Sequence, residues 1–256
     1  MSSTAPPILV VAGPTASGKS ALALHLAEAF DGTIINADSM QVYRDLAVLT
    51  ARPTAAEEAR VPHRLYGMID AAERCSAGRW RRLALAEIAA ARAAGRLPIL
   101  VGGTGLYLQA LLQGLAEIPP VPAAVREAAR ALHAALGGDE FRRRLAAYDP
   151  ESAQRLAPGD TQRLIRAYEV ALATGRALSE WQREPAAASP AAGGEAAAVV
   201  LLPPRPALYA ACDGRLTAML AQGAAAEVRA LLARELAPDL PAMNAVGGRE
   251  VGAWLA

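Results

Sequence analysis

The sequence predicts an α/β protein in which a mostly parallel sheet is flanked by helices and interrupted by a helical insertion. Short β-branched runs alternate with helical patterns, as in proteins whose parallel strands are joined by right-handed crossovers. From about Pro119 to Trp181 the strand pattern stops and only helical patterns remain. Hydrophobic residues make up 53% of the 256 residues and aromatic residues only 4%. This composition is typical of a helix-rich globular protein with a sizeable core.

The alternating part of the chain begins with an apolar run that leads into a glycine-rich loop. The later runs likewise end in turn residues before a helical pattern follows. A long helix is expected to end at Gly95, where glycine suits a left-handed cap. The expected elements are, in order, strand 7–13, helix 21–30, strand 32–39, a candidate strand 64–70, helix 80–95, strand 97–105 and strand 197–204.

The insertion contains helical segments at residues 121–136, 139–149 and 160–175. Asp139 and Asp160 are candidate N-caps, because a carboxylate can accept the free backbone N–H groups of a first helical turn. The low-complexity stretch 185–198 is expected to form a loop that returns to the sheet. The predicted organisation is a first part of the core at 1–118, a helical insertion at 119–184 and a second part of the core at 185–256.

Charge and cysteine content exclude several classes of protein. The net charge of +1 and a pI near 7.8 give no global basic field, so contact with nucleic acid has to come from local arginine clusters. Cys75 and Cys212 make neither a disulfide framework nor a four-ligand zinc site. The N-terminus lacks the pattern of a signal peptide, and no stretch has membrane-spanning length. A reduced, cytoplasmic setting is expected.

The loop after the first strand has the sequence GPTASGKS, which is the phosphate-binding pattern G-x4-G-K-S between a strand and a helix. Its glycines let backbone N–H groups turn toward anionic oxygens, and the following helix directs its positive end at them. Lys19 is the only lysine among 26 basic residues, and a compact ammonium reaches between phosphates where the broad arginine fork does not fit. Ser20 can offer its hydroxyl to Mg²⁺. The loop comprises Gly13, Pro14, Thr15, Ala16, Ser17, Gly18, Lys19 and Ser20.

Polar residues also follow two other predicted strands. Asp38 lies directly after the second strand, with Ser39 and Gln41 beside it, and Thr104 follows two glycines at the end of a later strand. Ligands of an open parallel sheet collect beyond the carboxyl ends of its strands. Asp38 could act there as a catalytic carboxylate, or it could cap a helix or hold Mg²⁺ through water. For Thr104 the alternatives are a hydroxyl near the transferring phosphate and a helix cap.

Seven segments follow one another in the order and spacing of the tRNA dimethylallyltransferases. The sequence resembles this family over nearly its whole length, from about residue 8 onward, in GPTASGKS, ADSMQVYRDL, TARP, PHRL, LVGGTGLYLQALLQGL, DTQRLIRAYEV and NAVGGRE. The resemblance implies a P-loop core like that of nucleotide kinases. It also implies transfer of a dimethylallyl group from dimethylallyl diphosphate to N6 of the adenosine 3′ of the anticodon. The loop would then hold the diphosphate, with Mg²⁺ on Ser20.

The resemblance assigns roles to residues near the loop. Asp38 matches the general base that accepts a proton from the exocyclic amine, a role typically worth about 10²–10⁴-fold in rate. The charge that develops on the leaving diphosphate would be stabilised by Thr15, Lys19, Thr104 and a later arginine. Arg215 best matches that arginine, and Arg205 is a weaker candidate. Both arginines could also be ordinary surface residues of their helix.

The target adenosine is stacked in the anticodon arm, so the enzyme has to extrude it. The family's segment at the target base is similar to Ser39, Met40 and Gln41. Its helix that reads the anticodon loop is similar to residues 162–166. The full set implied to contact tRNA is Asp38, Ser39, Met40, Gln41, Thr104, Arg126, Gln162, Arg163, Leu164, Ile165, Arg166, Asn244, Gly247 and Arg249. The local cluster FRRRL, residues 141–145, is more typical of solvated helix surface.

The sequence departs from the family pattern in three places. It has Gly248 where an aromatic residue is usual, and Ala211 and Cys212 where an arginine and an aliphatic residue are usual. Members generally continue into another basic helix, whereas this chain ends at Ala256. Two alternatives to the prenyltransferase therefore stay open: an ATP-dependent small-molecule kinase on the same core, and an RNA-binding remnant without catalysis. A monomer is expected.

Overall fold

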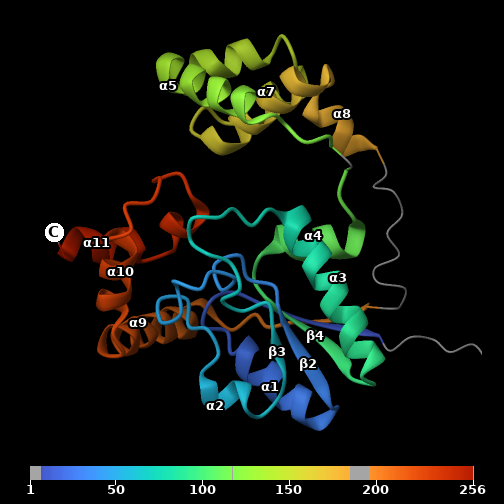
Figure 1. Cartoon of the computed structure of the whole chain (residues 1–256), viewed down its shortest axis with the longest axis vertical. Coiled ribbons are helices and arrows are strands. Elements are labelled where there is room, and N and C mark those ends of the chain that lie inside the picture. Colours follow the sequence, from blue (N-terminus) through green and yellow to red (C-terminus); the bar gives the residue numbers. More distant parts are fainter. Residues whose placement is uncertain (1–6, 117, 185–195, 256) are drawn as a thin grey trace, which may run out of the picture. The chain divides into compact units, whose positions relative to one another are not determined.

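The computed structural model describes residues 7–116, 118–184 and 196–255. The chain divides into two compact units, one of residues 1–113 with 190–256 and one of residues 114–189. The first unit contains the sheet, and the described part of the second contains only helices (Figure 1). The domain boundaries predicted from the sequence stay predictions, and most of the loop expected at 185–198 lies outside the described residues.

The first unit is built on a five-stranded sheet in the order β3-β2-β4-β1-β5. All of its pairings are parallel, which confirms the α/β class predicted from the alternating pattern. Because β4 lies between β1 and β2, the carboxyl ends of these three strands are neighbours. The strands are β1 (Ile8–Ala12), β2 (Gly32–Asn36), β3 (His63–Arg64), β4 (Leu97–Gly102) and β5 (Ala196–Val200).

The predicted strands 32–39, 97–105 and 197–204 extend three or four residues past the ends of β2, β4 and β5, and the candidate strand at 64–70 differs most. Only His63 and Arg64 pair with β2, because Leu65 and Gly67 have φ angles of 65° and 56°, which an extended strand cannot contain. Farther along, Ile69 forms an isolated parallel bridge with Tyr43. The segment therefore leaves the sheet after two residues.

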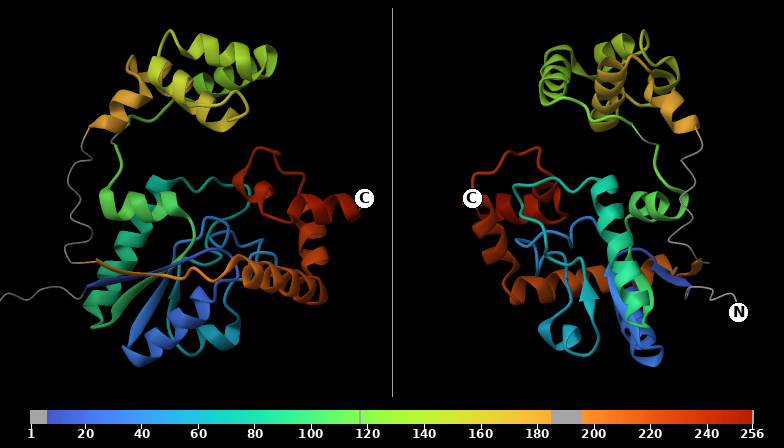
Figure 2. Two further views of the ribbon diagram at one scale, coloured as in Figure 1. Left: turned by 180° about the vertical axis from the view of Figure 1, so that it is seen from behind. Right: turned by 45° about the vertical axis from the view of Figure 1, so that its right-hand side comes forward.

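Helices cover both faces of the sheet, as Figure 2 shows from two further sides. The helix α1 (Lys19–Ala29) packs Ala23, Leu24 and Ala27 against one face. On the other face α3 (Ala77–Ala93) and α4 (Gly105–Gln113) lie against alternate residues of the same strands. The short helix α2 (Ala55–Glu58) begins with a capping box at Thr54. The predicted glycine cap of α3 is confirmed, since Gly95 has a φ angle of 73°.

The C-terminal helices pack against the chain that follows β2. Buried residues of these helices share one hydrophobic core with the segment from Val42 to Leu49. These elements (orange to red in Figure 1) are α9 (Arg205–Ala221), α10 (Ala224–Leu232), the 3-10 helix η2 (Pro241–Asn244) and α11 (Gly248–Leu255). The part of the chain described by the structure contains no helix long and apolar enough to cross a membrane.

The second unit has its own hydrophobic core, centred on Phe141 and Tyr168. Asp160 does precede a helix, as predicted, but its carboxylate accepts a hydrogen bond from Arg163 and caps no backbone N–H. The N-cap predicted at Asp139 is wrong: the second segment of its helix begins directly after the non-helical Gly137, so Asp139 already lies in the first helical turn of that segment. The helices are α5 (Ala123–Leu145), α6 (Pro150–Arg155), α7 (Thr161–Thr174) and α8 (Leu178–Arg183).

Candidate active site

The predicted phosphate-binding loop joins β1 to α1. Gly13 has a φ angle of 156°, and a Cβ atom there would lie 2.7 Å from both the carbonyl oxygen of Leu201 and Oγ of Ser17. Gly18 has a φ angle of 87° and is the N-cap of α1. Both positions therefore require glycine, one for close approach and one for its left-handed backbone. Within the loop Pro14 and Thr15 are exposed, and Ala16 has a φ angle of 61°.

Lys19 lies at the first position of α1 with its ammonium group turned back into the loop. Its Nζ atom donates a hydrogen bond to the carbonyl oxygen of Pro14 at 3.1 Å. Burial is the main cause that lowers the pKa of Lys19. The negative charge of Asp38 acts to raise this pKa, and the positive charge of Arg215 lowers it further. The three charged side chains thus share one electrostatic environment, although they are far apart in the sequence.

The two serine hydroxyl groups of the loop differ in their surroundings. The Oγ atom of Ser17 is buried without a hydrogen-bond partner among the described residues, and Ser20 is exposed. A buried polar group without a partner costs free energy, which an anion or a water molecule at the loop would recover. The described residues include no cluster of three His, Cys, Asp or Glu side chains that could hold a metal ion by themselves.

Asp38 follows β2 and organises the turn after it. Its Oδ1 atom accepts hydrogen bonds from the backbone N–H groups of Met40 at 2.8 Å and Gln41 at 3.4 Å. The backbone N–H of Asp38 donates to Oδ1 of Asn36 at 2.8 Å. Within the described chain no donor is recorded for the Oδ2 atom, so this oxygen can accept a proton. The carboxylate therefore has a structural role through one oxygen and is available for chemistry through the other.

The end of β4 meets the end of β2 and the loop at close range. Thr104 Oγ1 accepts a hydrogen bond from the backbone N–H of Ser39 at 2.9 Å and lies 3.3 Å from Oγ of Ser39. A Cβ atom on Gly102 would lie 2.2 Å from the carbonyl of Ala37, and one on Gly103 would lie 3.2 Å from the carbonyl oxygen of Gly13. The two glycines permit this contact. The residues predicted after three different strands are thus brought together.

Arg215 reaches the same region from α9. Its Nη2 atom donates a hydrogen bond to the carbonyl oxygen of Thr50 at 3.1 Å. Gln41 donates from Nε2 to the same oxygen at 2.9 Å and to the carbonyl oxygen of Ala51 at 3.0 Å. Arg205, the weaker candidate, lies exposed at the start of α9, and no side-chain interaction is recorded for it among the described residues. The geometry therefore favours Arg215.

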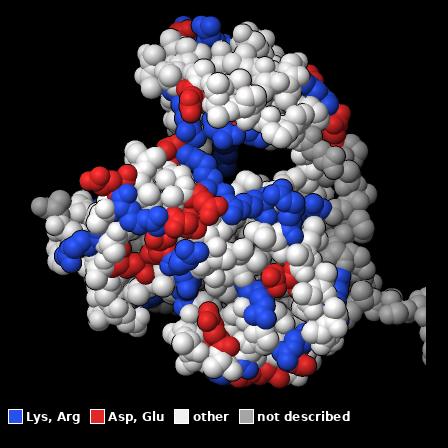
Figure 3. Space-filling model, in the orientation of Figure 1, with Lys and Arg blue, Asp and Glu red and all other residues white. Residues whose placement is uncertain are grey.

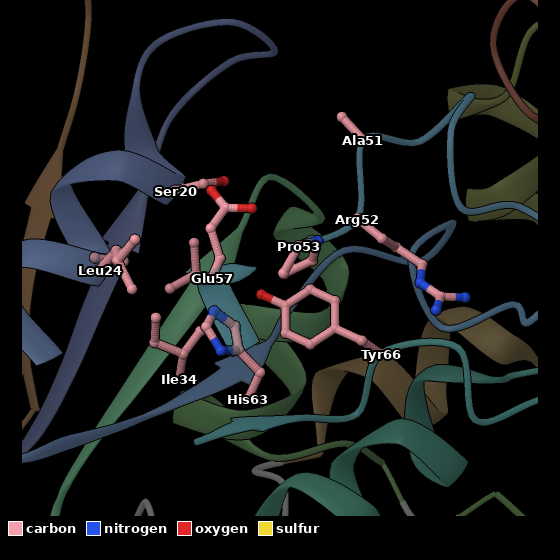
Figure 4. Close-up of a pocket in the computed structure, with 11 residues that line it drawn as sticks. Ser20, Leu24, Ile34, Ala51, Arg52, Pro53, Glu57, His63 and Tyr66 are labelled. Carbon is pink, nitrogen blue, oxygen red and sulfur yellow. The ribbon is translucent and has the colours of Figure 1, made fainter. Parts of the chain in front are cut away.

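A small pocket opens beside Ser20 between α1 and the segment that contains α2 (Figure 4). Tyr66 lines it, and burial together with the negative charge of Asp38 raises the pKa of its hydroxyl. Arg52 also lines the pocket and donates from Nη1 to the carbonyl oxygens of Tyr43 and Arg44. We did not identify these lining residues from the sequence, although Arg52 is part of the TARP motif and the pocket residue His63 is part of PHRL.

The second unit pairs two of the arginines expected to contact RNA. Glu169 is buried, and its carboxylate contacts Arg166 at 2.6 Å and Arg126 at 3.7 Å. Sequence reasoning missed this residue. Arg163 pairs with Asp160, and Gln162 is exposed.

Two further positions of the same helix have packing roles. Leu164 is 0% exposed and Ile165 packs against the same core. The side chain of Leu164 is therefore a core residue of this unit and not a surface contact. Ile165 is only partly buried. Contacts of these two residues with tRNA stay predictions, which Leu164 would satisfy through its backbone.

The NAVGGRE segment connects η2 to α11 in the first unit. Arg249 donates a hydrogen bond to the side-chain oxygen of Asn244. Gly247 has a φ angle of 84°, and a Cβ atom there would lie 3.4 Å from Leu49. Acidic and basic side chains are interspersed over the face of the first unit seen in Figure 3, in line with the net charge of +1.

Comparison with known proteins places these residues in a family context. Residues 41–256 match the family described as IPP transferase. The tRNA dimethylallyltransferase of Rhodospirillum centenum is 60% identical over 249 residues, which are 97% of this chain and 79% of that protein. Its namesake from Rhodospirillum rubrum is 56% identical over 249 residues, 97% of this chain and 76% of that protein.

Solved structures give the same result. The full-length tRNA isopentenylpyrophosphate transferase of Bacillus halodurans is 29% identical with a TM-score of 0.64, over 97% of this chain and 77% of that one. A eukaryotic dimethylallyltransferase acting on tRNA is 28% identical with a TM-score of 0.80, over 98% of this chain and 63% of that one.

Proposed function

Since the chain belongs to the IPP transferase family, we propose that it transfers a dimethylallyl group from dimethylallyl diphosphate to tRNA, at N6 of the adenosine 3′ of the anticodon. The observation that carries this proposal is the meeting of three strand ends. The loop after β1, Asp38 after β2 and Thr104 after β4 lie together, and Arg215 reaches the same place. An anion-binding loop beside a free carboxylate oxygen suits a reaction that expels diphosphate and removes a proton.

The reaction exchanges one bond for another. The exocyclic nitrogen of the adenine forms a bond to the allylic carbon, while the bond from that carbon to the diphosphate oxygen breaks. The electron pair of the broken bond leaves with the diphosphate. The nitrogen loses one proton, which we assign to Oδ2 of Asp38. Because Oδ1 is held by Met40 and Gln41, the carboxylate is fixed in orientation before the amine arrives.

The leaving diphosphate gains negative charge as the bond breaks. The Lys19 ammonium, the Arg215 guanidinium, the backbone N–H groups of the loop and the hydroxyls of Thr15 and Thr104 stabilise it. Lys19 is well suited to this role because it is partly buried and has little solvent to lose. Its lowered pKa has burial as the leading cause. A bound anion would return the stabilisation that burial removes.

Ser20 is the residue that would hold Mg²⁺ at the loop. Its exposed hydroxyl can serve as one ligand, and without a carboxylate cluster in the described chain the remaining ligands would be diphosphate oxygens and water, as Mg²⁺ usually prefers in such sites. Bound there, Mg²⁺ would supply charge neutralisation for the diphosphate. Ser17, with its unpartnered buried hydroxyl, would bond the diphosphate from inside the loop.

The RNA side of the reaction requires the target adenosine to leave its stack, which costs a few kcal/mol. We assign contacts with the extruded base and its neighbours to Ser39, Met40 and Gln41, and contacts with the anticodon loop to Arg126, Gln162, Arg163 and Arg166. Asn244, Gly247 and Arg249 are further candidate contacts. We also propose that the reaction takes place in the cytoplasm and that the enzyme acts as a monomer.

Transfer of labelled dimethylallyl groups to an anticodon stem-loop tests the proposal. Asp38→Asn should lower the rate about 10²–10⁴-fold while diphosphate binding is retained. Asp31→Asn is the matched control, because Asp31 lies at the opposite end of β2 and is exposed. Label that binds but never reaches RNA in the wild type would identify a remnant, and ATP consumption with a small acceptor would identify a kinase.

A further inference from the structure

The segment between β2 and α2 has its backbone held by a carboxylate from a distant helix. Glu227 lies in the first turn of α10. Its Oε2 atom accepts hydrogen bonds from the N–H groups of Ala47 at 2.7 Å and Val48 at 2.8 Å, and its Oε1 atom accepts one from Leu49 at 2.8 Å. Three consecutive backbone donors thus point at one side chain.

This contact is built into the core and is not a chance surface pairing. The residue after Glu227 is Val228, which is buried in the same hydrophobic cluster as Leu49. Glu227 itself is half-buried. Hydrogen bonds from backbone N–H groups to a carboxylate are roughly twice as strong as neutral ones. Three of them on a half-buried group fix the path of residues 47–49 relative to α10.

The next residues along this segment bond in the opposite sense, through their carbonyl groups. The carbonyl oxygen of Thr50 accepts hydrogen bonds from both Gln41 and Arg215. One peptide oxygen therefore joins the arginine assigned to the diphosphate with the glutamine assigned to the target base. The position of this oxygen depends on residues 47–49, since a displaced peptide moves its neighbours along the chain.

We propose that Glu227 is a positioning residue for the transfer reaction, which holds residues 47–49 so that the Thr50 carbonyl orients Arg215 and Gln41 together. This inference rests on the proposed function, because the roles of Arg215 and Gln41 come from it. Glu227 does not touch either substrate. It sets the distance between the diphosphate site and the base site through a single loop.

A purely stabilising role for Glu227 is the alternative, and the chain offers a matched comparison. Arg234 lies just past α10 and joins the same region by ion pairs with Asp45 and with Asp70 at 2.7 Å. It ties the same two parts of the unit together as Glu227 does. Its contacts, however, stop short of residues 47–51. Arg234→Gln therefore removes anchoring without releasing the Thr50 carbonyl.

The experiment compares Glu227→Gln and Arg234→Gln with the wild type in the full chain. The glutamine keeps the shape of the side chain, but its NH₂ group cannot accept a hydrogen bond from the backbone N–H groups that face it. We expect Glu227→Gln to weaken binding of inorganic pyrophosphate by calorimetry and to lower kcat for transfer roughly 10–100-fold, since a misplacement of about 1 Å has effects of this size. For Arg234→Gln, both the pyrophosphate affinity and kcat should stay within about threefold of the wild type. This should hold even if its thermal midpoint falls as much as that of Glu227→Gln. If Glu227→Gln does not fold, Glu227→Asp takes its place.

A double-variant cycle separates positioning from stability. If Glu227 acts on the diphosphate through Arg215, then Glu227→Gln combined with Arg215→Gln should bind pyrophosphate no more weakly than Arg215→Gln alone. Additive losses, equal losses in Glu227→Gln and Arg234→Gln, or wild-type behaviour of Glu227→Gln would each overturn the inference. A wild type that never transfers label to RNA would instead overturn the proposed function, and the pyrophosphate measurements would still decide whether Glu227 positions Arg215.

Discussion

Gly102 offers a direct test of whether the meeting of strand ends creates the active site. The glycine ends β4, and a Cβ atom added to it would lie 2.2 Å from the carbonyl carbon and oxygen of Ala37. Ala37 immediately precedes Asp38, and its carbonyl oxygen accepts a hydrogen bond from the N–H of Thr104. Gly102→Ala therefore pushes apart the two strand ends that carry Asp38 and Thr104.

The size of the effect follows from the overlap. Real Cβ atoms essentially never approach closer than 3.0 Å, so the two backbones have to separate by about 0.8 Å or more. Backbone atoms cannot rotate away as a flexible side chain does, and overpacking of this kind costs about 1–3 kcal/mol. The thermal midpoint should fall by about 2–4 °C per kcal/mol. A displacement near 1 Å between base and electrophile lowers the rate about 10²-fold.

Gly105→Ala is the control, because Gly105 begins α4 and a Cβ atom there meets nothing within 4 Å. The assay is single-turnover transfer of labelled dimethylallyl groups to an anticodon stem-loop, alongside thermal unfolding. Gly102→Ala should fold, bind pyrophosphate and transfer slowly, whereas Gly105→Ala should match the wild type. A Gly102→Ala variant with the wild-type rate would refute the argument that this contact aligns the site.

Three further predictions concern the loop and the helical unit. Lys19→Arg keeps the positive charge but not the compact ammonium, and calorimetry should find pyrophosphate affinity reduced by about tenfold or more; unchanged affinity would show that charge alone is needed. In Asp149→Asn the four hydrogen bonds from Ser152 and Ser179 lose their charged acceptor. Burial of Asp149 acts to raise its pKa, but these bonds lower the pKa overall. The wild type should therefore have its full advantage in unfolding free energy over Asp149→Asn above about pH 5, and this advantage should shrink as the pH falls below about 4. A difference in unfolding free energy that does not change with pH would contradict this. Arg166→Gln should reduce the salt dependence of stem-loop binding by about one phosphate contact, whereas Glu140→Gln, at a half-buried position where the carboxylate pairs with Arg143, should leave it unchanged.

The sheet and the loop could be predicted because their signals are local. Strand periodicity and glycine spacing within residues 8–20 are sufficient to fix β1, the turn and the start of α1. The end of β3 could not be predicted in this way, because the left-handed backbone of Leu65, which a residue other than glycine rarely adopts, depends on tertiary packing. Leu164 lies in a motif that resembles an RNA-reading helix, but which side of that helix is buried depends on its neighbours in the unit.

The residues that position the site were harder to predict than the residues that carry the chemistry. Glu227 is an ordinary charged residue in the sequence, and its three backbone partners lie 178 to 180 residues away. No spacing rule connects such a pair. Arg52 bonds to carbonyl groups 8 and 9 residues away in an irregular segment, whereas Glu169 pairs with Arg166 at the i,i+3 spacing of a helix, a signal that the sequence does contain. A motif with a fixed spacing, such as the phosphate-binding loop, is identified because all of its partners lie within one short segment.

The position of Asp38 illustrates how far this dependence extends. Asn36 accepts a hydrogen bond from the N–H of Asp38 and donates others to the carbonyl oxygens of Asp38 and Leu65. The carbonyl of Asn36 in turn accepts a hydrogen bond from the buried indole of Trp80, which stacks on Tyr107 at 4.5 Å. Because these links are directional and buried or partly buried, the carboxylate that we propose as the base is held by the core of the unit and not by its own turn alone. The geometry of catalysis is therefore encoded largely in side chains that never touch a substrate.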